Sequence, residues 1–351
     1  MLKSIFNHQL KSKRGNPPRR NSGFTLIELL VAMIIAALVI TPLLGLMINI
    51  LSTDRNEQAK ATSEQQIKDA LDYIAADLKQ AIYIYDHSGL SQIHNSDPTI
   101  EQDGTIDSGI NDQIPPIADA TGCTDDTQCI PVLVFWKREY KSAVVPVGSN
   151  NVNICSTDPD QCNDAFVYSL VGYYLITTPD QTWSNTARIG RFEVSGSITR
   201  PNPSNPTTTE IIVAGDAGFD SFDLSLSGTL KQKMNQWTKD TPDFGSTTQV
   251  LVDYIDKTAN VPPGVPSGTT LDNAFCQGQL NSTQAQLVPQ NTNIENFYAC
   301  VDSGQNIAKI YLRGNALARI QPTDNEYTAS RSTFFPSANI VVEARGFLNA
   351  D

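Results

Sequence analysis

A basic segment followed directly by a long apolar run constrains this chain more than any other feature. The sequence RRNSGFTLIELLVAMIIAALVITPLLGLMINIL extends from Arg19 to Leu51, and its apolar part begins at Phe24, after Gly23. The portion from Leu29 to Leu51 is 23 residues long. As an α-helix it spans roughly 34 Å, which is enough to cross a bilayer. The segment therefore predicts a membrane-spanning helix.

A single carboxylate lies at the start of this apolar run. Glu28 stands five places after Gly23, and an acidic side chain at the middle of a membrane helix costs about 2.5–3.5 kcal/mol on insertion scales. A secretory signal peptide fits poorly, because its apolar core has about 7–15 residues and precedes a small-residue cleavage site. A plain membrane anchor explains the length but neither Glu28 nor the sharp Gly23–Phe24 boundary. The pattern indicates a function for Glu28.

Residues 23–40, GFTLIELLVAMIIAALVI, resemble the N-terminal signature of type IV pilins and of type II secretion pseudopilins. The resemblance implies a class III leader, residues 1–23, which a prepilin peptidase removes between Gly23 and Phe24, and N-methylation of Phe24. It also implies that Glu28 pairs with the N-terminal amine of its own or a neighbouring subunit in a filament. A buried carboxylate is tolerable when such a positive group meets it. The implied partners are the prepilin peptidase, other pilins or pseudopilins, and an inner-membrane assembly platform.

The charge distribution agrees with removal of this leader. The chain has 25 basic and 37 acidic residues, a formal net charge of −12. The leader contains six basic residues and no acid, so its removal leaves 19 basic against 37 acidic residues, a formal charge of −18. Basic residues on the cytoplasmic side predict a single-pass inner-membrane protein with its head in the periplasm, before it enters an envelope or surface filament. An acidic head lacks the clustered Lys and Arg of nucleic-acid binding, so no direct nucleic-acid partner is expected.

An amphipathic segment follows the apolar run. Its apolar residues recur at spacings of 4, 3, 4, 4 and 3, which marks one face of a helix: Ile67, Leu71, Ile74, Leu78, Ile82 and Tyr85. The sequence predicts that this helix, residues 52–86, continues the transmembrane and assembly helix of residues 24–51. Pro42 and Gly45 predict a bend in the apolar part.

Three later segments resemble the larger minor pilins and the J-type pseudopilin of general secretion. Residues 71–81, LDYIAADLKQA, place Asp77 and Lys79 where those proteins have an Asp and a basic residue late in the first helix. From spacing alone, both side chains are expected on a solvated helix face. Residues 166–194 and the segment KIYLRGNALARI, residues 309–320, resemble the sheet region of the same proteins. Size, acidity and motif order also resemble the cyanobacterial pseudopilins linked to hormogonium polysaccharide secretion.

Beyond residue 86 turn formers become frequent, and short apolar or alternating runs appear between them. These runs predict strands at Ile130–Tyr140, Phe166–Thr177, Ile189–Val194, Glu210–Ala214, Phe219–Leu226, Gln249–Ile255, Ile307–Leu312 and Asn339–Ala344. Turn-rich connectors are expected at Thr199–Thr209 and Asn260–Thr270. Strands after one long helix predict an α+β fold, in which the N-terminal helix packs on an antiparallel β-rich head of residues 87–351.

All six cysteines lie in the exported part of the chain: Cys123, Cys129, Cys155, Cys162, Cys276 and Cys300. An even number outside the cytoplasm predicts up to three disulfides, with fifteen possible connectivities. Pairing of near neighbours is the arrangement we expect, because each such pair encloses a polar loop. Disulfide-stapled loops suit a head that must persist outside the cell.

Neither a metal nor a cofactor is expected. Zinc is disfavoured because no C-x-x-C occurs and only two histidines, His87 and His94, lie outside the leader. The Asp-rich loops CTDDTQC and STDPDQCND could supply oxygen ligands to calcium, but neither has EF-hand spacing, and acidic loops are more often solvated. No G-x-S-x-G, P-loop, H-E-x-x-H or G-x-G-x-x-G motif is present. The sequence therefore predicts a protein that is not an enzyme.

These features predict a minor pilin or pseudopilin, a structural subunit of a type IV pilus or a type II secretion-like filament. A tip or priming position, supporting motility or the export of polysaccharide or protein, suits the large head. Two alternatives remain open. One is a pilus-borne adhesin whose head recognises a carbohydrate or a cell surface, with Trp183 and Trp237 as contacts unless they are core residues. The other is a single-pass, membrane-anchored extracytoplasmic enzyme.

Overall fold

The structure is a computed structural model that describes residues 23–99, 106–116, 123, 127–147, 153–241, 244–245, 247–259, 261–265, 269–290 and 296–346. The chain divides into two compact units, Met1–Asp54 and Arg55–Asp351. One helix, α1 (Leu26–Leu78), begins in the first unit and ends in the second. Pro42 lies inside α1 without ending it, so the expected bend does not interrupt the helix.

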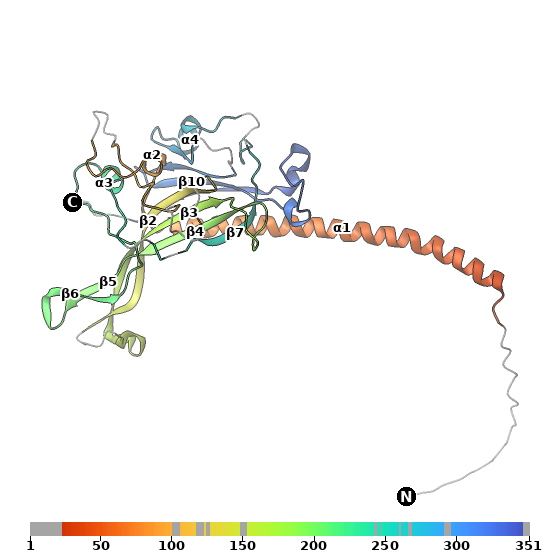
Figure 1. Ribbon diagram of the computed structural model, residues 1–351, viewed down its shortest axis with the longest axis horizontal. Coiled ribbons are helices and arrows are strands. Elements are labelled where there is room, and N and C mark those ends of the chain that lie inside the picture. Colours follow the sequence, from red (N-terminus) through yellow and green to blue (C-terminus); the bar gives the residue numbers. More distant parts are fainter. Residues whose placement is uncertain are drawn as a thin grey trace, which may run out of the picture. The chain divides into compact units, whose positions relative to one another are not determined.

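Within the described residues, the strands all lie in the second unit, and every strand pairing is antiparallel (Figure 1). A five-stranded sheet has the order β1 (Ala81–Ile84), β2 (Cys129–Pro146), β3 (Cys162–Ile176), β4 (Ala187–Ser195) and β7 (Gln249–Ile255). A four-stranded sheet has the order β11 (Ser337–Glu343), β10 (Ile307–Arg313), β9 (Phe297–Asp302) and β8 (Gln286–Val288). A separate hairpin pairs β5 (Ile198–Asn202) with β6 (Asn205–Val213). The predicted α+β fold, with a long helix and an antiparallel head, is confirmed.

Short helical turns occupy the connections between these strands. They are α2 (His87–Ser91), η1 (Ile154–Ser156), η2 (Pro159–Gln161), α3 (Leu230–Met234), α4 (Asn273–Leu280), η3 (Leu317–Arg319) and η4 (Ala329–Phe334). Local capping explains two of them. The Thr229 side chain and Gln232 form a reciprocal capping box at the start of α3, and Asp272 caps α4 by accepting from the amide of Phe275.

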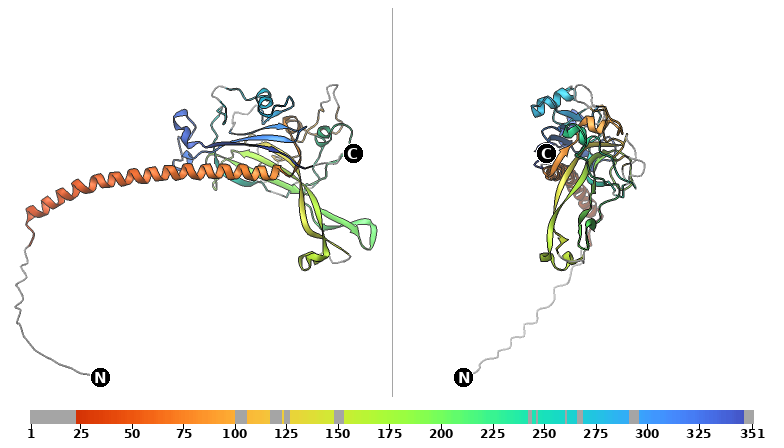
Figure 2. Two further views of the ribbon diagram at one scale, coloured as in Figure 1. Left: turned by 180° about the vertical axis from the view of Figure 1, so that it is seen from behind. Right: turned by 90° about the vertical axis from the view of Figure 1, so that its left-hand side faces the viewer.

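The C-terminal part of α1 packs along the sheets and completes the core of the second unit (Figure 2). Its buried apolar residues in the main core are Ile67, Ala70, Leu71, Ile74, Ala75 and Leu78, within one apolar cluster that includes strands of both sheets. Gly314 shows how closely the helix approaches: a Cβ there would lie 2.9 Å from Cγ1 of Ile67. The glycine of the late Arg-Gly-Asn segment is thus required by helix packing.

The helix ends earlier than its apolar stripe predicts. It stops at Leu78, and Ala81–Ile84 forms β1, paired with β2 and buried throughout. Ile82 therefore lies in a strand, and the expected helix of residues 52–86 is wrong in its last part. The local sequence AIYIY is rich in β-branched and aromatic residues, which favour strands. Spacings of 3 and 4 residues between apolar positions do not distinguish this strand from a helix. A fully buried strand has apolar residues at every position, so it also satisfies the helical spacing.

Seven of the eight predicted strands are found, as β2, β3, β4, β6, β7, β10 and β11. Phe219–Leu226 is wrong, since it forms no strand; Phe219 and Phe222 instead pack edge-on against Trp136. The expected connector Thr199–Thr209 is also wrong, because most of it forms the β5–β6 hairpin around a turn at residues 203–204. The connector Asn260–Thr270 has no helix or strand in its described residues, 261–265 and 269–270. β1, β5, β8 and β9 are strands that the sequence pattern does not predict.

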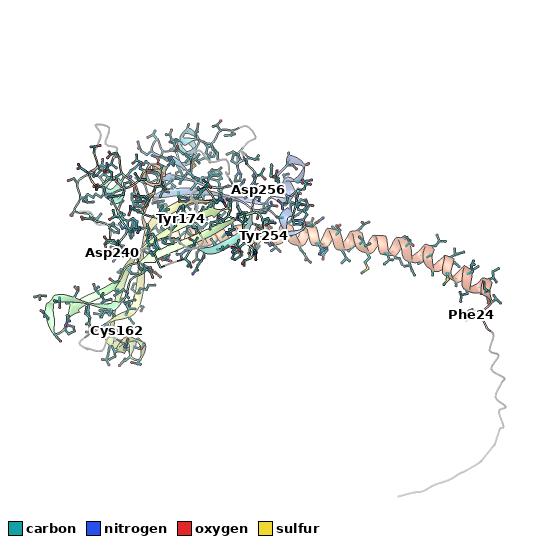
Figure 3. The ribbon with its side chains drawn as sticks, viewed as in Figure 1. Phe24, Cys162, Tyr174, Asp240, Tyr254 and Asp256 are labelled. Carbon is teal, nitrogen blue, oxygen red and sulfur yellow. A yellow bond between two sulfur atoms is a disulfide. The ribbon has the colours of Figure 1, made fainter. Side chains whose placement is uncertain are left out.

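Three disulfides join the same neighbouring pairs expected from the sequence. They are Cys123–Cys129, Cys155–Cys162 and Cys276–Cys300, with Cα atoms 5.4, 5.8 and 5.1 Å apart. Cys276–Cys300 joins α4 to β9 inside a small satellite core. Cys155–Cys162 joins η1 to the start of β3, and Figure 3 places Cys162 beside the β5–β6 hairpin in an arm that extends from the body of the second unit.

Candidate functional site

The start of α1 carries the residues that the sequence singles out. Gly23 and Phe24 precede the helix, and the Phe24 side chain is 86% exposed. Glu28 Oε2 accepts hydrogen bonds from the Thr25 amide and the Thr25 hydroxyl, both at 2.9 Å. The amide of Glu28 in turn donates to Thr25 Oγ1 at 3.3 Å. This is a reciprocal capping box. Its T-x-x-E signature is present in the sequence, although Glu28 attracted attention there only as a carboxylate in an apolar run. The rest of the leader, residues 1–22, lies outside the described residues.

The first unit presents its apolar side chains without cover. Its large apolar residues from Phe24 to Leu51 are all exposed. Among the described residues, α1 is the one helix long and apolar enough to cross a membrane, a test of length and composition only. Exposed apolar surface of this extent marks a membrane or protein contact, since soluble monomers rarely expose such patches. The helix thus has the character of a membrane anchor.

A buried ion cluster holds the other end of α1 to the sheet. Asp77 Oδ2 accepts from Arg191 Nε at 2.8 Å and from the Tyr173 hydroxyl at 2.7 Å, and Asp77 Oδ1 lies 3.4 Å from Lys137 Nζ. Glu193 closes the ring, at 2.7 Å from Lys137 Nζ and 2.6 Å from Arg191 Nη2. Two acids and two bases therefore compensate each other across α1, β2, β3 and β4. We call these five residues the Asp77 cluster.

The surroundings of Asp77 keep it ionised. Burial on its own would raise the pKa of Asp77, but the hydrogen bonds from Arg191 and Tyr173 and the positive charges of Arg191 and Lys137 outweigh it, and the pKa lies below its ordinary value. The pKa of Tyr173 is raised well above its ordinary value, by burial first and then by the charge of Asp77. Tyr173 therefore stays protonated and donates a hydrogen bond to the ionised carboxylate throughout the physiological range.

The Asp77 cluster makes the stability of the second unit dependent on pH in acid. Because the folded pKa of Asp77 is depressed, its contribution is fully present above the unfolded value of 3.8 and is lost as pH falls through the folded pKa. We expect the difference in unfolding free energy between the wild type and Asp77→Ala to be constant near neutral pH and to shrink below pH 3.8. Denaturant titrations at a series of pH values measure it. A difference that shrinks already between pH 7 and 5 would contradict the assignment to Asp77.

The position of Asp77 corrects an expectation drawn from spacing. Asp77 is buried, whereas Lys79 is exposed as a solvated helix face predicts. The resemblance to larger pseudopilins had marked both positions, but the helical spacing gave no sign that Asp77 faces the sheet. Its partners come from strands 60 to 114 residues away in the chain, so helical periodicity carries no information about them.

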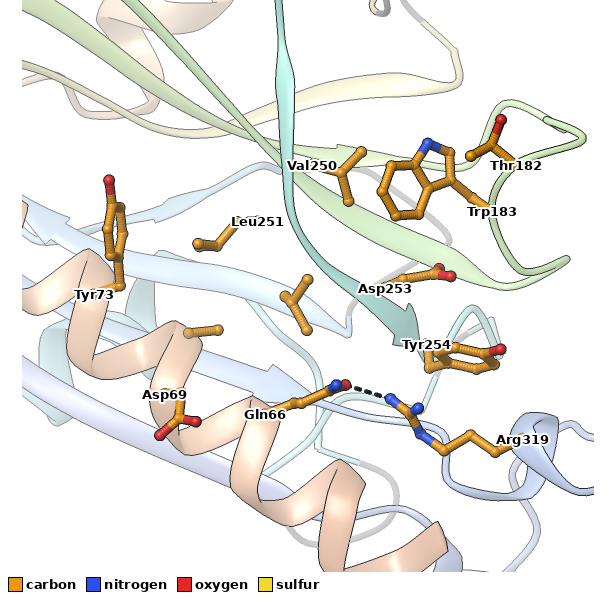
Figure 4. Close-up of a pocket in the computed structure, with 12 residues that line it drawn as sticks. Gln66, Asp69, Tyr73, Thr182, Trp183, Val250, Leu251, Asp253, Tyr254 and Arg319 are labelled. Carbon is orange, nitrogen blue, oxygen red and sulfur yellow. Dashed lines mark hydrogen bonds between the residues drawn. The ribbon is translucent and has the colours of Figure 1, made fainter.

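An open groove lies between the C-terminal part of α1, the edge strand β7 and the loop before β4 (Figure 4). It has a volume of about 630 Å³, and its polar lining includes Gln66, Asp69, Asp253 and Arg319. Trp183 lines the groove with 38% of its surface exposed. Trp237, the other candidate contact, is 3% exposed and packs against Trp136. Trp237 is therefore a core residue, and only Trp183 remains in a position to bind a ligand.

The acidic loops do not form a metal centre in the described residues. No group of three His, Cys, Asp or Glu side chains among them could hold a metal ion. Asp164 instead accepts hydrogen bonds from the Tyr140 hydroxyl at 2.5 Å and the Ala143 amide at 2.8 Å. Asp125 and Asp126 of the other loop lie outside the described residues.

Comparison with known proteins bears on the N-terminus. Residues 18–44 match the family model of the prokaryotic N-terminal methylation motif. No curated protein and no solved structure matches the chain. The motif supports a type IV pilin-like subunit, and it implies processing by a prepilin peptidase and assembly with other pilins. The match covers Gly23, Phe24 and Glu28 together with the first part of the exposed apolar helix.

Proposed function

We propose that this protein is a minor pilin or pseudopilin, a structural filament subunit and not an enzyme. One observation carries the proposal: α1 is a single continuous helix whose first part is apolar and uncovered and whose last part is fixed into the head by the Asp77 cluster. A subunit of this design transmits any pull on its membrane helix to the head without a hinge loop. Such a pull would move a growing pilus, or it would move an exported polymer or protein.

The size of the head supports a tip or priming position. The second unit comprises residues 55–351 with two packed sheets, an arm and three disulfides. Repeating so large a head at every step of a narrow helical filament would be sterically unfavourable. A position at the end, where the subunit has neighbours on one side only, accommodates it.

The processing of the N-terminus tests this function directly. We expect the mature chain, purified from membranes, to begin at N-methylated Phe24, because a prepilin peptidase cuts after Gly23. Intact-protein mass spectrometry with N-terminal peptide mapping measures it. A chain that retains Met1 would contradict the filament subunit and favour a plain membrane anchor, including the anchored-enzyme alternative. Gly23→Leu, which blocks access to the cut bond with a bulky side chain, should leave the leader in place.

An in-frame deletion separates the two filament systems. Surface pili and exported polysaccharide are scored in the same cells. Loss of pili, with polysaccharide reduced only as a consequence, assigns the protein to a type IV pilus. Pili that persist while export fails assign it to a secretion filament.

An adhesive head is a second candidate function. The position of Trp183 in the open groove favours it, since a solvent-accessible indole in a groove with polar side chains is a common ligand contact. This function is compatible with filament assembly, because the groove residues are remote in sequence from the Thr25–Glu28 capping box.

A further inference from the structure

The groove beside β7 has two aromatic side chains available to a ligand. Trp183, from the loop before β4, is 38% exposed, and Tyr73, on α1, is 48% exposed. Figure 4 shows them at separate parts of the groove, with Val250 and Leu251 of β7 between them. The accessible rings and the apolar strand give a surface on which the C–H face of a ring-shaped ligand can lie.

Polar groups that line the same groove are held in place by bonds inside the protein. Asp253 accepts from the Ser184 amide at 2.8 Å through Oδ2 and from the Ser184 hydroxyl at 2.7 Å through Oδ1. Each carboxylate oxygen keeps a further lone pair, because a carboxylate has about four acceptor sites. Gln66 accepts from Arg319 through its carbonyl oxygen, so its amide nitrogen retains two donor hydrogens. The groove therefore offers oriented acceptors and donors, as ligand recognition requires.

A strained residue lies at the same place. Tyr254 has φ of 61°, a left-handed conformation that is rare for a bulky side chain. It is held there by a hydrogen bond from the Asn315 amide to its carbonyl, at 2.7 Å, and by Arg319, whose guanidinium lies 4.0 Å from the centre of its ring. Backbone strain of this kind persists only where surrounding contacts enforce it, and it clusters at ligand sites.

We propose that this groove binds a neutral saccharide. Ring faces for stacking, with fixed carboxylate and amide groups in the same groove, match the C–H faces and hydroxyl groups of a hexose chain. Asp69 and Asp253 against the single cation Arg319 leave the groove with one net negative charge, which disfavours uronic-acid chains. The volume of about 630 Å³ lies within the range of small-ligand sites. This inference rests on the adhesive function proposed second above and specifies its ligand class.

An extended peptide paired with the edge of β7 is the competing occupant. The five residues Val250–Tyr254 all line the groove, and consecutive strand residues face opposite sides of a sheet, so the strand edge itself is accessible. The C-terminal end of this edge is already occupied, because the Asn315 amide bonds to Tyr254 and the Asp256 amide bonds to Arg313. The exposed rings and oriented side chains favour the saccharide.

The test uses the full chain in detergent micelles and three neutral tetrasaccharides: cellotetraose, maltotetraose and mannotetraose. Trp183 is the one exposed tryptophan of the three in the chain, because Trp136 and Trp237 are buried. Acrylamide quenching of tryptophan fluorescence therefore reports on the groove, and at least one neutral tetrasaccharide should protect Trp183. Calorimetry should then show that Trp183→Ala weakens binding about tenfold or more and that Tyr73→Ala weakens it severalfold. Tetragalacturonate should bind at least tenfold more weakly than the neutral ligand.

Tyr140→Ala is the matched control, because Tyr140 is 53% exposed on β2 and outside the groove, and its loss should leave binding unchanged. Failure of all three neutral tetrasaccharides to bind, or full binding by Trp183→Ala, would overturn the proposal. Periodate oxidation destroys the saccharides of a surface. If cells carrying the protein still adhere to such a surface and no tetrasaccharide binds, the saccharide proposal is overturned, while the adhesive function of the head stands. Neither result depends on leader processing, so the filament function stands or falls separately. Purified polysaccharide from the producing cells is titrated in the same calorimeter. Binding of this polysaccharide identifies the ligand as an exported polymer, whereas binding of the tetrasaccharides without it identifies a foreign glycan.

Discussion

Replacing Asp77 with alanine is expected to lower the free energy of unfolding of the second unit by about 3–5 kcal/mol. The substitution leaves the buried Lys137 and the partly buried Arg191 with only Glu193 to compensate them, and removes the acceptor of the Tyr173 hydroxyl. An uncompensated buried charge is among the largest single-residue effects on stability. Urea unfolding followed by the fluorescence of buried tryptophans measures the change.

Asp72→Ala is the control for this prediction, since Asp72 is exposed on the same helix one turn and a half earlier. It should change the unfolding free energy by no more than about 0.5 kcal/mol. Asp77→Asn keeps the size of the side chain and one acceptor, so it should be less destabilising than alanine and gives a folded variant if alanine prevents folding. Equal stability of Asp77→Asn and the wild type would show that the charge of Asp77 contributes nothing to the attachment of α1.

Removing the charge of Glu28 is expected to leave leader cleavage intact and to reduce incorporation into the filament about a hundredfold or more. In an assembled bundle the buried terminal amine would lose the carboxylate that compensates its charge, and breaking such a pair costs about 3–5 kcal/mol. The measurement compares the amount of subunit in sheared filaments with the amount in membranes. Mass spectrometry on the same membranes reports cleavage.

The capping box allows the two roles of Glu28 to be separated. Glu28→Gln retains a side-chain acceptor for Thr25, because a capping box accepts Gln as well as Glu, but it removes the charge. Glu28→Ala removes both. If the charge registers the subunit, the two variants should be equally defective. Normal incorporation of Glu28→Gln would assign the function to the helix cap. Glu64→Gln, at an exposed residue on the same helix that pairs with Lys68, is the matched control.

The local sequence sufficed for features that depend on neighbours in the chain. The apolar length of α1, the apolar runs of β2 and β3, and the pairing of nearby cysteines all follow from interactions within a few tens of residues. The end of α1 was predicted wrongly because it depends on a segment that is distant in the chain. Ala81–Ile84 is a strand because β2 provides a hydrogen-bonding edge for it, and that edge lies about fifty residues further along the chain.

The sequence by itself indicated a type IV pilin-like class for this protein, through its N-terminal motif. A basic segment ending at Gly23, a carboxylate at Glu28 and a membrane-length helix are read without knowledge of any distant contact. The tertiary structure alone decided what the head presents. It buried Asp77 among strands from three parts of the chain, placed Trp237 in the core, and left Trp183 in a groove with Gln66 and Asp253. Periodicity describes which face of an element is apolar, whereas burial and convergence depend on which elements meet, and that is decided by packing of the whole chain.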